Sequence, residues 1–213
     1  MHCPIDGWEA AEPLSRSSWQ QIWSARKVGS TEVTGLLRVV TIPAYAGEAE
    51  ALRDGGFSEE RIKKHIADCA ERCLRDGEAL MASGSRRMPE IKAVKLRRSG
   101  DGDYRLWMLS TYYPTFTKYY EGKRISRGTL LSLFCDLCDA VGDYASVGMV
   151  HGAVQLENVY VDRVGSCLLG NPLFKPTLYS RILDPDDTRL LRFIAPEIAR
   201  GEDYDTRSDI CSL

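Results

Sequence analysis

Residues 150–162 read Val-His-Gly-Ala-Val-Gln-Leu-Glu-Asn-Val-Tyr-Val-Asp, the most informative stretch of the 213-residue chain. His151 opens a loop, and Asn158 closes it seven positions later. The next three residues, 159–161, are β-branched and aromatic, a composition that favours strands. The sequence therefore predicts a polar loop that runs directly into a short buried strand.

This loop resembles the catalytic loop of protein kinases, His-Arg-Asp-Leu-Lys-Pro-Glu-Asn. In that family the Asp accepts the proton of the substrate hydroxyl, and the Asn holds a magnesium ion. The positions that keep the pattern are His151, Leu156, Glu157 and Asn158. The positions that depart from it are Gly152 for the Arg, Ala153 for the catalytic Asp and Gln155 for the Lys. The resemblance implies a loop that keeps its shape but lacks the general base, whose help is typically worth ~10²–10⁴ in rate.

Segments downstream of the loop extend the resemblance. Ala195, Pro196 and Glu197 match the Ala-Pro-Glu that ends the kinase activation segment. Residues 204–210 are similar to the start of the long central helix of the large lobe. In the family, the Asp at the position of Asp209 hydrogen-bonds the backbone of the catalytic loop, so the resemblance implies the same role here.

Upstream, residues 36–40 resemble the Val-Ala-Ile-Lys strand of kinases, with Arg38 at the Lys position. Helical periodicity, with Ser58 as a possible N-cap, predicts a helix over 58–82 at the place of kinase helix C. Alternation predicts strands over 90–97 and 104–113 around a hairpin turn at 99–103. A second helix is predicted over 126–147, where Gly148 ends it.

This order of elements implies an α+β chain with the bilobal protein kinase-like fold. Residues 1–111 would form the β-rich small lobe with helix C, 112–117 the hinge, and 118–213 part of a mostly helical large lobe. Because the family has further helices in that lobe, we expect the fold to be incomplete at the C-terminus. Apolar surface should then remain exposed on the large lobe, and a truncated reading frame is one explanation.

Composition narrows the classes of function. Hydrophobic residues make up 44% of the chain, enough to bury a core, and the net charge of −2 argues against a nucleic-acid binder. The sequence has no apolar run near 18 residues and no signal peptide, which argues against a membrane protein. Seven cysteines without a disulfide-framework spacing suit a reducing compartment, so a cytoplasmic location is expected.

Two cysteine patterns could be read as metal sites. One is Cys135-x-x-Cys138, and the other is His65, Cys69 and Cys73 at helical spacing. A structural zinc site normally needs four ligands. Cys135 and Cys138 lie within an apolar helical pattern, and free cysteine packs well as a small hydrophobe. Core cysteines are therefore favoured over a metal site.

The kinase resemblance also identifies the positions that would hold nucleotide. Kinases cover the ATP phosphates with Gly-x-Gly-x-x-Gly, and the matching stretch, 14–23, has Ser15, Ser17 and Gln20 in place of the three glycines, with Trp19 at its aromatic tip. Three added side chains would crowd the triphosphate. An ordinary strand pair is therefore favoured over a working phosphate loop.

Arg38 keeps a positive charge at the Lys position, although its planar fork is wider than an ammonium group. The alignment puts Gly77 at the position of its usual helix C partner, a Glu, with Asp76 and Glu78 on either side. A slip of one residue turns a helical side chain by about 100°. An ion pair with Glu78 and a nucleotide contact both stay open for Arg38.

The slot of the magnesium-binding Asp-Phe-Gly motif holds Asn171, Pro172 and Leu173. Magnesium prefers carboxylates together with phosphates, so Asn158 and Asn171 would make a poor metal site. A structural role for Asn158 in bonding the loop backbone is favoured. ATP and magnesium are thus possible cofactors, but with a weakened site.

Four functions follow from these residues. The chain would be an inactive pseudokinase that binds a protein partner, a divergent Ser/Thr kinase with residual phosphotransfer, a sensor that binds ATP without hydrolysis, or a truncated relic. The first is favoured, because phosphate loop, base and metal ligand are altered together while scaffold residues survive. Possible phosphorylation sites are Thr177, Tyr179, Ser180 and Thr188.

Overall fold

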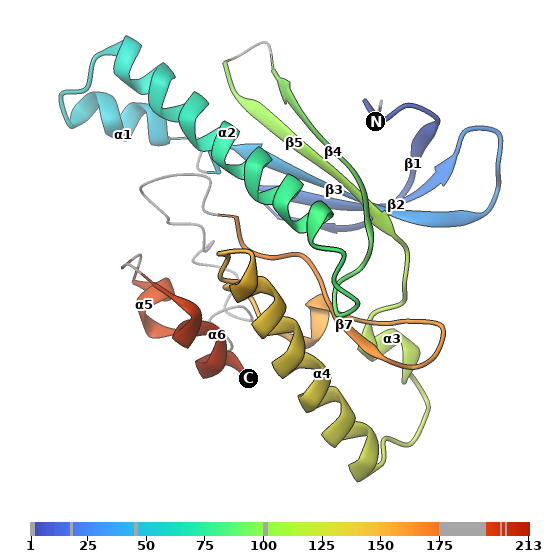
Figure 1. Cartoon of the computed structure of the whole chain (residues 1–213). Helices are drawn as coiled ribbons and strands as arrows, with labels where there is room; N and C mark the ends of the chain where they lie inside the picture. Colours follow the sequence, from blue (N-terminus) through green and yellow to red (C-terminus); the bar gives the residue numbers. More distant parts are fainter. Residues whose placement is uncertain are drawn as a thin grey trace. The chain divides into compact units, whose positions relative to one another are not determined.

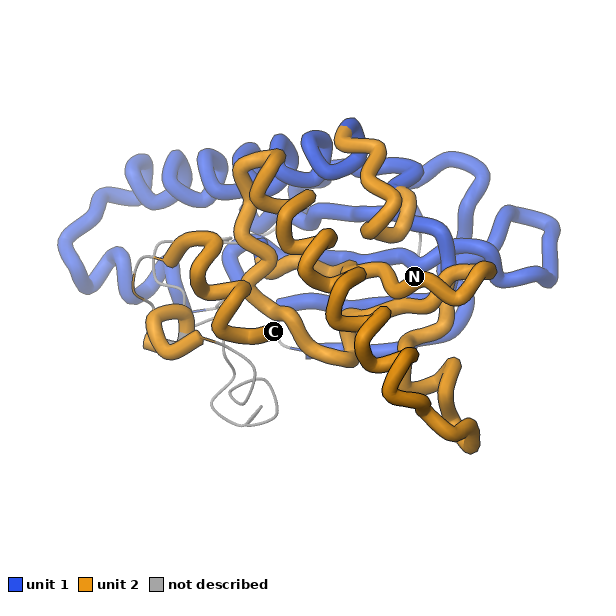
Figure 2. Tube along the Cα trace, turned by 60° about the horizontal axis from the view of Figure 1, so that its bottom comes forward, with its two compact units in different colours: residues 1–82, 91–112, 174–184 blue, residues 83–90, 113–173, 185–213 orange. Residues whose placement is uncertain are grey.

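The computed structural model describes residues 3–17, 19–44, 47–99, 102–174, 195–200, 202 and 204–213. The four possible phosphorylation sites lie outside these residues. The chain divides into two compact units, shown in Figure 2. Unit 1 contains the described residues of 1–82 and 91–112 together with Phe174, and unit 2 contains those of 83–90, 113–173 and 195–213. Helices and an antiparallel sheet occur together, which confirms the α+β class.

Unit 1 is built on a five-stranded antiparallel sheet in the order β1-β2-β3-β5-β4. Its strands are β1 (Trp8–Arg16), β2 (Gln20–Lys27), β3 (Val33–Ile42), β4 (Ile91–Arg98) and β5 (Tyr104–Thr111). The central strand β3 is buried from Gly35 to Val40, on both of its alternating faces. The predicted hairpin is confirmed: β4 pairs with β5, and Ser99 N–H donates to the Asp103 carbonyl at 2.6 Å.

Helix α2 (Glu59–Ser83) lies along one face of this sheet (Figure 1). This confirms the helix predicted over 58–82. Gly77 permits a close approach, since a Cβ there would lie 3.0 Å from the Val94 side chain. A short helix that the periodicity did not predict, α1 (Glu48–Asp54), precedes it. The buried residues of α2 are Ile62, Ile66, Cys69, Ala70, Cys73, Gly77 and Leu80.

The N-terminal segment, residues 3–7, covers part of the opposite face of the sheet. Cys3 and Ile5 belong to one buried cluster with side chains of β2, β3 and β5. Lys95 on β4 fixes the segment: its Nζ donates to the Pro4 carbonyl at 3.0 Å and pairs with Asp6 at 3.2 Å. The other members of the cluster are Ala25, Leu37, Val39, Trp107 and Leu109.

Unit 2 contains the second predicted helix, α4 (Arg127–Ser146), which is confirmed. Ser126 caps it by accepting the Thr129 N–H at 3.0 Å. Gly148, with φ +76°, follows the helix as predicted. The remaining elements of unit 2 are α3 (Phe116–Tyr119), a 3₁₀ turn η1 (Leu156–Asn158), β6 (Val159–Val161), β7 (Cys167–Leu169), α5 (Pro196–Ala199) and α6 (Thr206–Ser212).

The prediction of core cysteines is wrong for Cys135 and Cys138, which are both exposed on α4. They lie off the buried face of the helix, which runs through Leu133, Leu137, Ala140, Val141 and Tyr144. Cys69 and Cys73 are buried as predicted, and burial raises the pKa of Cys73 to about 12. The described residues contain no group of three or more side chains suited to hold a metal ion.

Apolar side chains are exposed on α4, as expected for this part of the chain. Leu130 is 51% exposed, Leu131 65% and Phe134 50%. Among the described residues, no helix has the length and apolar character needed to cross a membrane.

Candidate functional site

The loop of residues 150–158 is held by one buried carboxylate. Asp209 on α6 accepts the backbone N–H of His151 at 2.6 Å and that of Gly152 at 2.7 Å. Its side chain is 1% exposed, and burial raises its pKa, against the opposing effect of the two N–H donors. Helix α6 begins where the Asp205 side chain accepts the Arg207 N–H. The cap therefore fixes the helix end that carries Asp209.

His151 is fully buried and joins the loop to Gly170, the residue after β7. Its Nδ1 lies 3.2 Å from the Ala153 N–H, and its Nε2 lies 2.8 Å from the Gly170 carbonyl oxygen. Because Nδ1 must accept, the proton of a neutral imidazole belongs on Nε2, which donates to Gly170. Tyr144 packs edge-on against the imidazole at 4.9 Å. The ring thus serves as a structural group that bonds the loop backbone and Gly170.

Ala153, which the resemblance to kinases aligns with the general base, is 6% exposed. A methyl group cannot accept a proton. Its carbonyl oxygen accepts the Asn158 Nδ2–H at 2.9 Å, and this hydrogen bond joins the two ends of the segment 153–158. Gln155, at the Lys position, is half-buried and immediately precedes η1. Within residues 150–158, the one carboxylate, Glu157, is exposed.

Asn158 and Asn171 bind each other. Asn171 Nδ2 lies 3.4 Å from Asn158 Oδ1 and 2.5 Å from the Tyr160 hydroxyl. Asn171 has φ +55°, a conformation that Asn tolerates better than most residues. The side-chain oxygen that would ligate a metal at Asn158 therefore accepts a hydrogen bond. These contacts favour the structural role predicted for Asn158.

The segment at residues 195–197 is fixed to α6 of the same unit. Ala195 is fully buried, and Pro196 occupies the first turn of α5, where its missing N–H costs nothing. The Ser208 hydroxyl donates to the Glu197 carboxylate. This hydrogen bond lowers the pKa of Glu197 below its usual value.

Replacing Ser208 with Ala is expected to raise the pKa of Glu197 towards its ordinary value. The contribution of Glu197 to stability is present above the ordinary pKa of Glu and is lost as pH falls through the lowered value. An NMR titration of the Glu197 carboxyl group checks this. Ser212→Ala is the control, because Ser212 donates to the Ser208 carbonyl and not to Glu197. Equal pKa values in Ser208→Ala and the unchanged protein would contradict the assignment.

In unit 1, Arg38 lies on β3 and is 3% exposed. Its Nε donates to Gln20 Oε1 at 2.9 Å. Its guanidinium carbon lies 5.7 Å from the Trp19 ring centre and 5.2 Å from that of Phe174. Both distances suit cation–π contacts. Arg38 is thus in contact with two aromatic rings and a side-chain amide.

The described residues of the stretch compared with the kinase phosphate loop, 14–17 and 19–23, lie at the end of β1, next to the connection and at the start of β2. Ser17 N–H donates to the Gln20 carbonyl at 2.8 Å, and the Ser17 hydroxyl accepts the Gln20 N–H at 3.2 Å. Ser15 is exposed on β1 and pairs with Ile22. Trp19 lies in this connection, just before β2, and its side chain is buried, with 4% of it exposed.

Glu78 is exposed on α2 and forms no ion pair with Arg38 in the described part of the chain. The helix instead turns the buried Gly77 towards the sheet. The structure thus brings Arg38 together with Gln20 but not with Glu78. Sequence reasoning missed the contacts of Arg38 with Trp19 and Phe174, because no local pattern links residues this far apart in the chain.

A scan against protein-family models finds no match, and a comparison with curated proteins finds no similar sequence.

Proposed function

We propose that the chain is a protein kinase-like domain that has lost phosphotransfer and acts as a protein-binding or regulatory module. The observation that carries this proposal is the loop of residues 150–158. Asp209, His151 and Asn158 hold its backbone by four hydrogen bonds, and His151 adds a fifth to the Gly170 carbonyl outside the loop. The position of the base is nevertheless a buried Ala153. A preserved loop around an absent base fits a scaffold better than a catalyst.

The surroundings of Arg38 support the same proposal. Gln20 replaces a glycine of the phosphate loop, and its amide oxygen takes the Arg38 Nε–H. Trp19 and Phe174 contact the guanidinium group through their rings. An arginine that binds a triphosphate needs guanidinium N–H groups that can donate to the phosphate oxygens. Gln20 would therefore hinder a nucleotide in two ways. Its side chain adds bulk, and its amide oxygen accepts the Arg38 Nε–H that a phosphate would otherwise accept.

Calorimetric titration with ATP, with and without magnesium, tests the proposal on chain shown to be folded by circular dichroism. The expected result is no binding tighter than about 1 mM, which corresponds to ~4 kcal/mol. Transfer of labelled phosphate should not exceed that of an Arg38→Ala variant. Magnesium-dependent transfer above that control would contradict the loss of catalysis and favour a divergent Ser/Thr kinase. Tighter ATP binding without transfer would favour a nucleotide sensor.

A further inference from the structure

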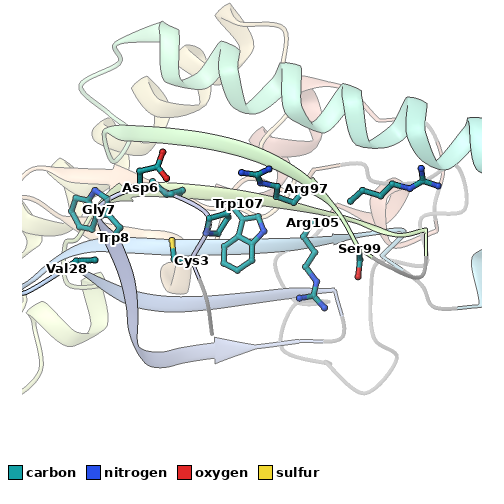
Figure 3. A pocket seen from close by; sticks show the side chains of 12 residues that line it. Cys3, Asp6, Gly7, Trp8, Val28, Arg97, Ser99, Arg105 and Trp107 are labelled. Atoms are coloured by element: carbon teal, nitrogen blue, oxygen red, sulfur yellow. The ribbon is translucent and has the colours of Figure 1, made fainter.

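A basic hollow lies on the face of the sheet that carries the N-terminal segment. Its volume is about 630 Å³. Figure 3 shows the side chains of Arg97, Arg105 and Trp107 lining it beside that segment. Cys3, Trp8 and Ser99 also line it. The size falls within the usual range of small-ligand pockets, about 300–1,000 Å³.

Two arginines occupy directly paired positions on adjacent strands that line this hollow. Arg97 on β4 is the direct partner of Arg105 on β5, and both are exposed. Like charges directly opposite each other destabilise a strand pair. Neither arginine forms an ion pair within the described part of the chain, and the one carboxylate that lines the hollow, Asp6, pairs with Lys95.

Two general explanations do not account for this pair. Basic residues on an edge strand prevent sheets from joining, and this explains Arg97 on β4. It does not explain Arg105, because β5 lies between β3 and β4. A generally basic protein would also place arginines together, but the net charge of the chain is −2.

We propose that the hollow binds a phosphate monoester carried by a planar or apolar group. A dianionic phosphate neutralises two guanidinium groups, whereas one carboxylate neutralises a single one. The two side chains diverge in Figure 3, as like charges do, and their exposure lets them swing towards an anion between them. The indole of Trp107, 5% exposed, offers an apolar surface in the hollow, and Ser99 also lines it. This site lies within unit 1 and is independent of the proposed loss of phosphotransfer.

Calorimetry with phenyl phosphate tests the site on the whole chain. Three proteins are compared: the unchanged chain, Arg97→Ala/Arg105→Ala, and a control, Arg86→Ala/Arg124→Ala. The control removes the same charge at two exposed arginines outside the hollow. The expected result is binding that the first variant weakens about tenfold or more and the control leaves within about twofold, since hydrogen bonds to charged groups carry the contact.

Absence of binding to the unchanged chain would overturn the proposal, and so would equal binding by all three proteins. Inorganic phosphate should bind more weakly than phenyl phosphate, and equal affinity would contradict the role of the apolar surface. A tyrosine-phosphorylated peptide distinguishes the two sources of the group. Tighter binding of the peptide than of phenyl phosphate would indicate a phosphorylated protein partner, and equal or weaker binding a small phosphorylated compound. Circular dichroism of both variants excludes unfolding as the cause of lost binding.

Discussion

Replacing Asp209 with Asn is expected to lower the free energy of unfolding by about 3 kcal/mol. Both carboxylate oxygens accept buried backbone N–H groups, from His151 and Gly152. An Asn side chain has one acceptor oxygen, and its NH₂ group would face the second N–H. One charge-assisted hydrogen bond is weakened, and one buried donor is left without an acceptor, at a cost of about 1–3 kcal/mol. Relief from burying a charge offsets part of this loss.

Urea denaturation of the unchanged protein and of Asp209→Asn measures the effect. Asp205→Asn is the matched control on the same helix. Asp205 caps α6 and is exposed, and Asn caps helices about as well as Asp, so its expected cost is below about 0.5 kcal/mol. Equal losses in the two variants would mean that Asp209 does not hold the loop. A loss confined to Asp209→Asn supports its role as the anchor of residues 151–152.

Acidification should widen the difference between the unchanged protein and Asp209→Asn. Burial raises the pKa of Asp209 above its ordinary value of 3.8. The folded state therefore takes up this proton more readily than the unfolded chain, so the contribution of the group to stability rises as pH falls from neutral towards 3.8. The Asn variant has no such titration. Repeating the denaturation at several pH values checks the sign.

Local elements of the fold could be predicted from the sequence because their signals are local. The apolar spacing of α2 and α4 and the turn residues between β4 and β5 depend on neighbours within a few positions. The contact of Asp209 with the loop backbone was predicted from the resemblance to kinases and not from periodicity. The structure places that carboxylate on the N–H groups of His151 and Gly152.

Contacts between distant segments could not be predicted in this way. Arg38 meets Phe174 across 136 positions of the chain, and no local pattern encodes such a pair. The N-terminal segment is too short for its apolar residues to show a periodic pattern. Its packing on the sheet could therefore not be predicted from the sequence. Cys135 and Cys138 lie in a part of α4 where apolar residues occur on more than the buried face of the helix. Composition alone could not show which of these apolar residues are buried.

The second large effect is expected at Gly152, where the kinase pattern has Arg. Its φ of +72° disfavours every side chain, at a cost of about 1–2 kcal/mol. A Cβ would also lie 3.1 Å from the Leu173 Cβ. Leu173 cannot move away freely, because its N–H donates to the His151 carbonyl at 2.7 Å. Crowding of this kind costs about 1–3 kcal/mol more, so Gly152→Ala should lose about 3 kcal/mol in total.

Gly148→Ala separates the two causes. Gly148 has a similar φ of +76°, but a Cβ there would meet no atom within 4 Å. Its expected loss is therefore about 1–2 kcal/mol, the cost of the backbone conformation alone. Equal losses at the two glycines, measured by urea denaturation, would refute crowding by Leu173. A larger loss at Gly152 would mean that this loop is packed around glycine, so that an arginine at this position would disturb the loop.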